Sequence, residues 1–107
     1  MDKWLKIEIA AVMIFVLGCS YDHLTTAYGL MLPNIIETND VVVFLMKYGI
    51  WHLVEIIIIA AGIGLGYVAF SSKADEILYL SSIALTSGGL VRLFAGIQNL
   101  TIILNII

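Results

Sequence analysis

The sequence predicts an all-α membrane protein whose three transmembrane helices form a single domain over residues 1–107. Hydrophobic residues make up 62% of the chain and charged residues 12%, whereas soluble domains are nearer half apolar and a quarter charged. The mean hydropathy is +1.08, and a soluble domain of this size could not bury so much apolar surface. Because the apolar runs do not alternate with period two, a transmembrane sheet is disfavoured. We therefore expect a multi-pass protein of the cell membrane.

The first helix is expected over about residues 2–30. Trp4 stands near its start and Tyr21 or Tyr28 near its end, where amphipathic aromatic side chains favour the membrane interface. Pro33 then follows among turn-forming residues. Since proline lacks a backbone donor and fixes its φ angle, this segment predicts the first loop.

The second helix is expected over about residues 40–70, with one of the polar residues at 38–40 as its cap. Its main part, Ile50–Phe70, is apolar except for His52 and Glu55. A helix rises about 1.5 Å per residue, so roughly 20 apolar residues cross a hydrocarbon core of about 30 Å. At roughly 45 Å this helix exceeds that thickness, and it must tilt or project beyond the membrane.

The third helix is expected over about residues 77–104, after a polar loop at 71–76, and Arg92 interrupts its apolar run. This arrangement puts the N-terminus and the second loop on one side of the membrane. The two sides carry unequal basic charge, with Lys3, Lys6 and Lys73 on the first side and Lys47, Glu37 and Asp40 on the second. The positive-inside rule then predicts a cytoplasmic N-terminus and an external C-terminus.

Three ionisable residues, Asp22, Glu55 and Arg92, fall at one depth when each expected helix is counted from its cytoplasmic end. A separation of 15 residues, or about 22 Å of helix rise, is obtained for each of the pairs Ile7 to Asp22, Phe70 to Glu55 and Ile77 to Arg92. Arg92 can then pair with either carboxylate or with both. Pairing removes most of the cost of placing a charge inside the membrane.

These charges allow a structural and two functional interpretations. The structural one is an intramembrane polar network of Asp22, His52, Glu55 and Arg92 that locks the helices together. The first functional one is a proton or ion path, or the wall of a partner's active site. The second is an intramembrane enzyme in which Asp22, His52 and Glu55 act as acid and base, which requires a water-filled pocket. We favour the structural interpretation and assign no catalytic residue to the chain.

Metal binding is not expected from the spacing of possible ligands. His52 and Glu55 are three residues apart and share a helix face. A metal site needs three or four ligands, and no second pair of His, Cys or Glu stands at helical spacing. His23 is expected to face away from its neighbour Asp22. The sequence therefore assigns no metal-ligating or cofactor-binding residue to this chain.

Small residues predict where the helices approach one another. Gly62 and Gly66 on the second expected helix are four residues apart, a spacing that permits close helix contact. Gly88 and Gly89 on the third helix offer a possible counterpart. We interpret these glycines as packing residues because no Lys-Ser/Thr pair follows them to make a phosphate-binding loop.

Several segments together resemble the small X subunit of archaeal ammonia monooxygenase. The resemblance covers nearly the whole chain and is carried by Trp4–Lys6, Tyr21–Thr26, Asn34–Asp40, Gly49–His52 and Val91–Leu100. It lies in overall pattern, length and isoleucine-rich style and includes no catalytic motif. Elements such as Asp22-x-x-x-Thr26 also resemble an uncharacterised family of small multi-helix membrane proteins.

The resemblance implies an accessory subunit of a copper-dependent complex that oxidises ammonia to hydroxylamine. Its partners would be the larger membrane subunits of that complex and the lipid bilayer, and those subunits would hold the copper. Nucleic acid is not expected as a partner because the chain has no basic run. The alternative is a small homo-oligomeric transporter or ion-conducting protein that uses the layer of Asp22, Glu55 and Arg92.

Overall fold

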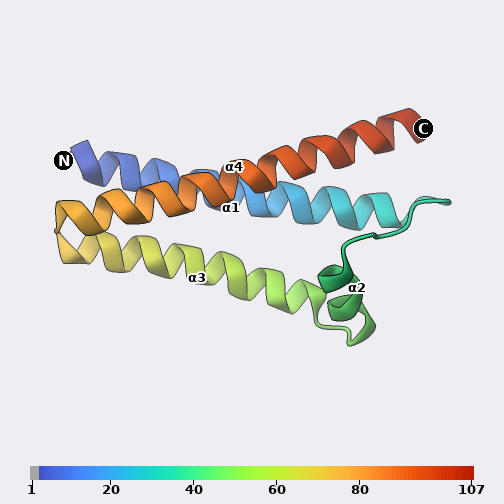
Figure 1. Cartoon of the computed structure of the whole chain (residues 1–107), viewed down its shortest axis with the longest axis horizontal. Coiled ribbons are helices and arrows are strands. Elements are labelled where there is room, and N and C mark those ends of the chain that lie inside the picture. Colours follow the sequence, from blue (N-terminus) through green and yellow to red (C-terminus); the bar gives the residue numbers. More distant parts are fainter. Residues whose placement is uncertain (1–2) are drawn as a thin grey trace.

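The computed structural model describes residues 3–107, and this part of the chain contains helices and no strand. The elements are α1 (Lys3–Leu30), α2 (Asp40–Lys47), α3 (Trp51–Ser72) and α4 (Asp75–Ile106) (Figure 1). Helices α1, α3 and α4 are each long and apolar enough to cross a membrane. The expected all-α class with three candidate membrane spans is thus confirmed. Asp2, where the first helix was expected to begin, lies outside the described residues.

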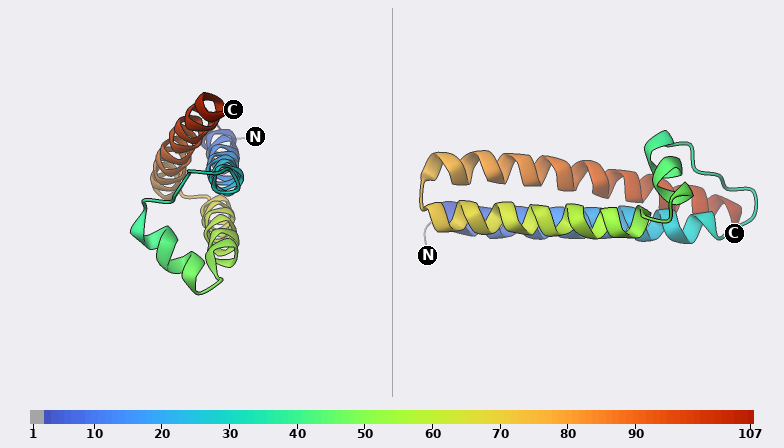
Figure 2. Two further views of the ribbon diagram at one scale, coloured as in Figure 1. Left: turned by 90° about the vertical axis from the view of Figure 1, so that its right-hand side faces the viewer. Right: turned by 90° about the horizontal axis from the view of Figure 1, so that it is seen from below.

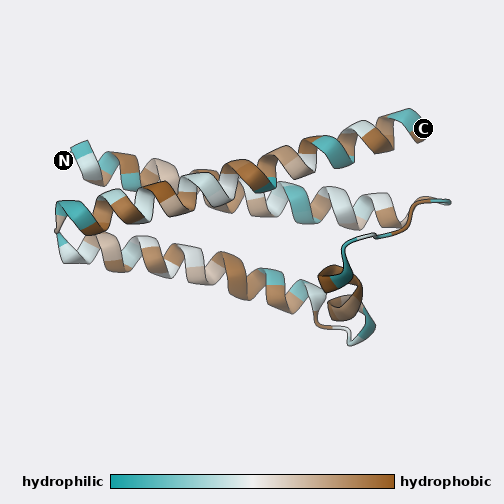
Figure 3. Cartoon of the chain, in the orientation of Figure 1, coloured by the Kyte–Doolittle hydropathy of each residue, from teal (hydrophilic) through white to brown (hydrophobic). Residues whose placement is uncertain are grey.

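The three long helices run side by side, and α1 lies at the centre of their packing. Helix α1 packs against α4 along much of its length and also against α3, whereas α3 and α4 share less contact. The start of α1 and the short turn from α3 to α4 lie at one end of the bundle, and α2 lies towards the other, where α4 ends (Figure 1). Hydrophobic residues cover most of α3 and α4, with hydrophilic positions towards the ends and at a few places between them (Figure 3).

The single helix expected over 40–70 is wrong, because the structure divides it into α2 and α3. Gly49 has a φ of +70°, the left-handed conformation that glycine adopts without steric cost. Its N–H donates to the carbonyl of Met46 at 3.0 Å, and the N–H of Ile50 donates to the carbonyl of Leu45 at 3.0 Å. These two bonds form a Schellman motif, which satisfies the last carbonyls of α2 and ends the helix although the apolar pattern continues.

Helix α2 is short and has a well-formed start. The Asn39 side chain accepts hydrogen bonds from the N–H groups of Val41, at 3.0 Å, and Val42, at 3.4 Å. Asn39 is one of the residues from which a cap was expected. Figure 2 shows that α2 runs across the direction of the long helices instead of along it.

The glycines of α3 and α4 that were predicted as packing residues pack against α1. A Cβ at Gly62 would overlap the ring of Phe15, and one at Gly66 would overlap Val12. A Cβ at Gly88 would lie 3.6 Å from the opposite edge of the same ring. These glycines of α3 and α4 therefore pack against α1 and do not meet each other directly, because the Phe15 side chain lies between Gly62 and Gly88.

The closest backbone approach joins α1 to α4. A Cβ at Gly89 would lie 2.6 Å from the carbonyl oxygen of Ile14, and one at Gly18 would overlap the carbonyl of Gly89. Both glycines are buried. Small residues allow helix backbones to meet in this way, and the contact supplies van der Waals attraction between spans. Gly18 was not among the predicted packing residues.

Replacing Gly89 with alanine tests this contact. We expect Gly89→Ala to destabilise the bundle by about 1–3 kcal/mol, because the added methyl group meets the backbone of α1, which cannot move aside as a flexible side chain can. Gly64→Ala is the matched control, since no atom lies within 4 Å of a Cβ at that position. Unfolding in mixed micelles, followed by circular dichroism, measures both variants. Equal stability of the two would show that the α1–α4 contact is not tight.

Candidate functional site

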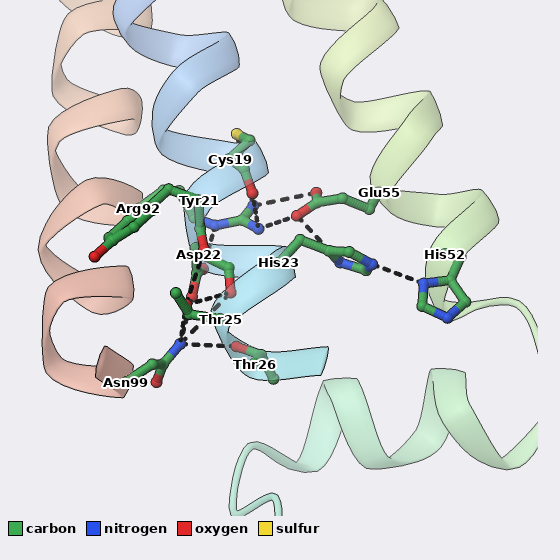
Figure 4. A network of polar contacts seen from close by, with 10 residues as sticks. All are labelled: Cys19, Tyr21, Asp22, His23, Thr25, Thr26, His52, Glu55, Arg92 and Asn99. Atoms are coloured by element: carbon green, nitrogen blue, oxygen red, sulfur yellow. Dashed lines mark hydrogen bonds and ion pairs between the residues drawn. The ribbon is translucent and has the colours of Figure 1, made fainter. Parts of the chain in front are cut away.

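The guanidinium group of Arg92 on α4 binds a carboxylate from each of the other two long helices (Figure 4). Its Nε donates to Oδ2 of Asp22 on α1 at 2.5 Å. Its Nη1 donates to Oε2 of Glu55 on α3 at 3.3 Å, and its Nη2 donates to Oε1 of the same carboxylate. The structure thus brings together the three charged residues that depth counting placed at one level.

Each nitrogen of this guanidinium group has a partner inside the bundle. Beyond the two carboxylates, Nη2 also reaches the carbonyl oxygen of Cys19 at 3.5 Å. The exposed fractions of the side chains are 28% for Arg92, 19% for Asp22 and 7% for Glu55. Arginine carries five donors in a rigid fork that suits such multiple binding. Once the charges are paired and hydrogen-bonded, the main cost of removing them from water is offset.

Asn99 forms a cluster of hydrogen bonds beside the charged layer, and this role of Asn99 was not predicted. Its side-chain amide donates to Thr26 Oγ1 at 2.8 Å, to Thr25 Oγ1 at 3.1 Å and to Asp22 Oδ1 at 3.2 Å. Thr25 itself donates to the carbonyl of Tyr21 at 2.8 Å, a common way to satisfy a threonine within a helix. Asn99 follows Arg92 by two helical turns, so it shares the face of that residue, which is the signal that could have found it.

His52 reaches the charged layer only through His23. The Nε2 atom of His23 lies 2.7 Å from Nδ1 of His52, so one ring donates a hydrogen bond to the other across α1 and α3. Nδ1 of His23 lies 3.5 Å from Oε1 of Glu55 without the geometry of a hydrogen bond. His52 is exposed. The sequence suggested no link between the two histidines, because their pairing depends on how α1 and α3 face each other.

The two imidazoles are the nearest approach to a metal site in the described part of the chain. Within residues 3–107, no three side chains of His, Cys, Asp or Glu are grouped so that they could hold a metal ion. A catalytic zinc site uses three protein ligands and a structural site four. The charged layer therefore presents carboxylates bound to arginine, and a histidine pair beside them.

A cavity of about 380 Å³ adjoins the charged layer. Its polar lining includes Asp22, His23, Glu55, Arg92 and Asn99, and its apolar lining comes mostly from α2 and α3. His52 is not part of this lining. A space of this size with polar walls can hold several water molecules, each of which occupies about 30 Å³ in the liquid. The charged layer thus faces, on one side, a space large enough for water.

A second buried carboxyl group, that of Glu8, lies nearer the other end of α1. Its exposed fraction is 1%. The hydroxyl of Ser81 donates to one of its oxygens and that of Ser82 to the other, both at 2.5 Å. Glu8 was not predicted as part of a network. The available signal for these bonds was a pair of adjacent serines near the start of the third expected helix. They lie at a depth close to that of Glu8.

The chain was compared with protein-family models, with curated proteins and with solved structures, and no match was found. These comparisons therefore neither support nor contradict the resemblance to the small subunit of ammonia monooxygenase.

Replacing Arg92 with leucine tests the role of the layer in stability. We expect Arg92→Leu to destabilise the bundle by up to about 3–5 kcal/mol, because both carboxylates lose their counter-ion in a mostly buried place. Unfolding in mixed micelles measures the loss.

The matched control removes all three charges together. In the triple variant Asp22→Asn, Glu55→Gln, Arg92→Leu, no ionised group is left unpaired, so we expect it to regain part of the stability that Arg92→Leu loses. A triple variant less stable than Arg92→Leu would show that the penalty does not come from unpaired carboxylates.

Proposed function

We propose that this chain is an accessory structural subunit of a membrane-bound, multi-subunit oxidoreductase. The observation that carries the structural role is the complete pairing of Arg92, whose guanidinium group ties α4 to Asp22 of α1 and Glu55 of α3. The kind of complex is taken from the sequence segments that resemble the small X subunit of archaeal copper-dependent ammonia monooxygenase.

A non-catalytic role fits the state of the ionisable groups. Asp22 and Glu55 are both bound to Arg92, so neither is a free base. The third candidate of the acid–base hypothesis, His52, bonds to His23 and does not line the cavity that the carboxylates share. In this proposal the copper ligands belong to the larger subunits, and the present chain supplies a rigid helical support.

The outer surface of the bundle supports the proposal of membrane partners. Large apolar side chains are exposed on all three long helices, and examples are Leu24, Ile56 and Phe94, whose exposed fractions lie above 60%. Because α3 and α4 share less contact with each other than with α1, the bundle is thin and open along one side. Lipid and the larger membrane subunits of the complex are the partners that we propose for this surface.

The cavity favours a second candidate function, that of a small homo-oligomeric transporter or ion-conducting protein. It places carboxylates and a guanidinium group beside a space that can hold water. A path through a single chain meets an obstacle, however. Phe15 fills the space between Gly62 and Gly88, and the backbones of Gly18 and Gly89 touch, between the charged layer and Glu8. A conducting pathway would therefore have to run between copies of the chain.

Purification from native membranes tests the first proposal. We expect an affinity-tagged chain, extracted in mild detergent, to bring larger membrane proteins with it, together with copper in stoichiometric amount. Native mass spectrometry and elemental analysis measure both. The Arg92→Leu variant should lose these partners, whereas Glu76→Gln, which changes a charge at the far end of α4, should keep them.

Recovery of the chain alone, as a stable functional monomer, would contradict the proposal. Recovery as a symmetric homo-oligomer, with ion flux in liposomes that Glu55→Gln abolishes, would favour the second function instead.

A further inference from the structure

Helix α2 carries more exposed apolar surface than a short helix in water would tolerate. Val41, Phe44 and Tyr48 have exposed fractions of 65%, 57% and 60%. They are spaced three and four residues apart and so lie on one face, and the rings of Phe44 and Tyr48 are in contact, with centroids 4.9 Å apart. Contiguous apolar surface of this kind marks a place where lipid or another molecule is bound.

The position of α2 identifies lipid as that molecule. Figure 2 shows α2 lying across the bundle direction beside the end at which α3 begins. The first turns of α3 expose Leu53, Ile56 and Ile57, which belong to a candidate membrane span and face outward. Helix α2 therefore lies at the end of a candidate membrane span, the level at which lipid headgroups would replace acyl chains.

The polar residues of α2 suit the same place. Asp40 and Lys47 are seven residues apart and share a face next to the apolar one. Asp40 lies in the first turn and Lys47 in the last, as the helix dipole favours. The Lys47 ammonium group lies 5.8 Å from the centre of the Tyr48 ring, a combination that allows the charge to reach water while the stem and ring stay in an apolar layer.

We propose that α2 is a membrane-interface helix, with Phe44 and Tyr48 seated at the boundary between lipid headgroups and acyl chains. Val41, at the edge of the apolar face, together with Val42 and Leu45, lines the cavity beside Arg92. Helix α2 thus separates the charged layer from acyl chains on the open side of the bundle, where contact between lipid and an ionised group would be costly. This inference does not depend on the identity of any partner protein.

Spin labels on α2 test the proposal in the full chain reconstituted into phosphatidylcholine vesicles. Single cysteines are placed at Phe44, Tyr48, Lys47 and Val42 in a Cys19→Ala background and labelled with a nitroxide. Power saturation then compares collisions with oxygen, which concentrates in the apolar layer, and with a water-soluble nickel chelate. We expect the ratio of oxygen to nickel accessibility to be several-fold higher for the labels at 44 and 48 than for the label at 47. The label at 42 should have low accessibility to both reagents.

Two results would overturn the proposal. Nickel accessibility at 44 and 48 equal to that at 47 would place α2 in water. Protection of 44 and 48 from both reagents would mean that protein, such as a second copy of the chain, covers this face. If Phe44→Cys fails to give the circular dichroism of the parent chain, the label at Tyr48 on the same face decides the result.

Discussion

The binding of Arg92 to two carboxylates is the interaction on which the rest of the bundle depends. A guanidinium group has no neutral form available in a protein, so a helix that carries it into the membrane must supply counter-ions at the same depth. Asp22 and Glu55 do so from two different helices. The pairing therefore sets the relative depth of α1, α3 and α4. A small shift of any one helix along its axis would leave a charged group without its ion-pair partner.

Packing around α1 explains why the polar groups form two separate clusters. The touching backbones of Gly18 and Gly89, with Phe15 between Gly62 and Gly88, leave little space in the middle of the bundle. The charged layer lies on one side of this region and Glu8, with Ser81 and Ser82, on the other. This division agrees better with two anchoring points for helices than with a continuous path through one chain. Helix α2 then adds a cover at the end nearest the charged layer.

Helices α1 and α4 and the end of α3 could be predicted to within a few residues, because length and continuous apolarity are local properties. The end of α2 was missed for the same reason, since apolar residues continue across Gly49 and only the backbone conformation there reveals the break. Asp22, Glu55 and Arg92 could be predicted to meet because depth along a helix follows from counting. Asn99 and Glu8 left signals in the sequence, namely the spacing of Asn99 from Arg92 and the depth that Glu8 shares with two serines. The pairing of His23 with His52 could not be predicted, because it depends on how α1 and α3 are rotated about their axes.

Three helices long and apolar enough to cross a membrane, an ionisable residue at a similar distance along each of them, and small residues that allow close helix contact all follow from the sequence alone. Which faces of the helices meet is a property of the folded chain. The tertiary structure put α1 between the glycines of α3 and α4, joined the two histidines, and turned α2 across the bundle. The physical reason is that apolarity along a span is nearly uniform around these helices, so the rotation of each one is set by contacts with its neighbours and not by its own pattern.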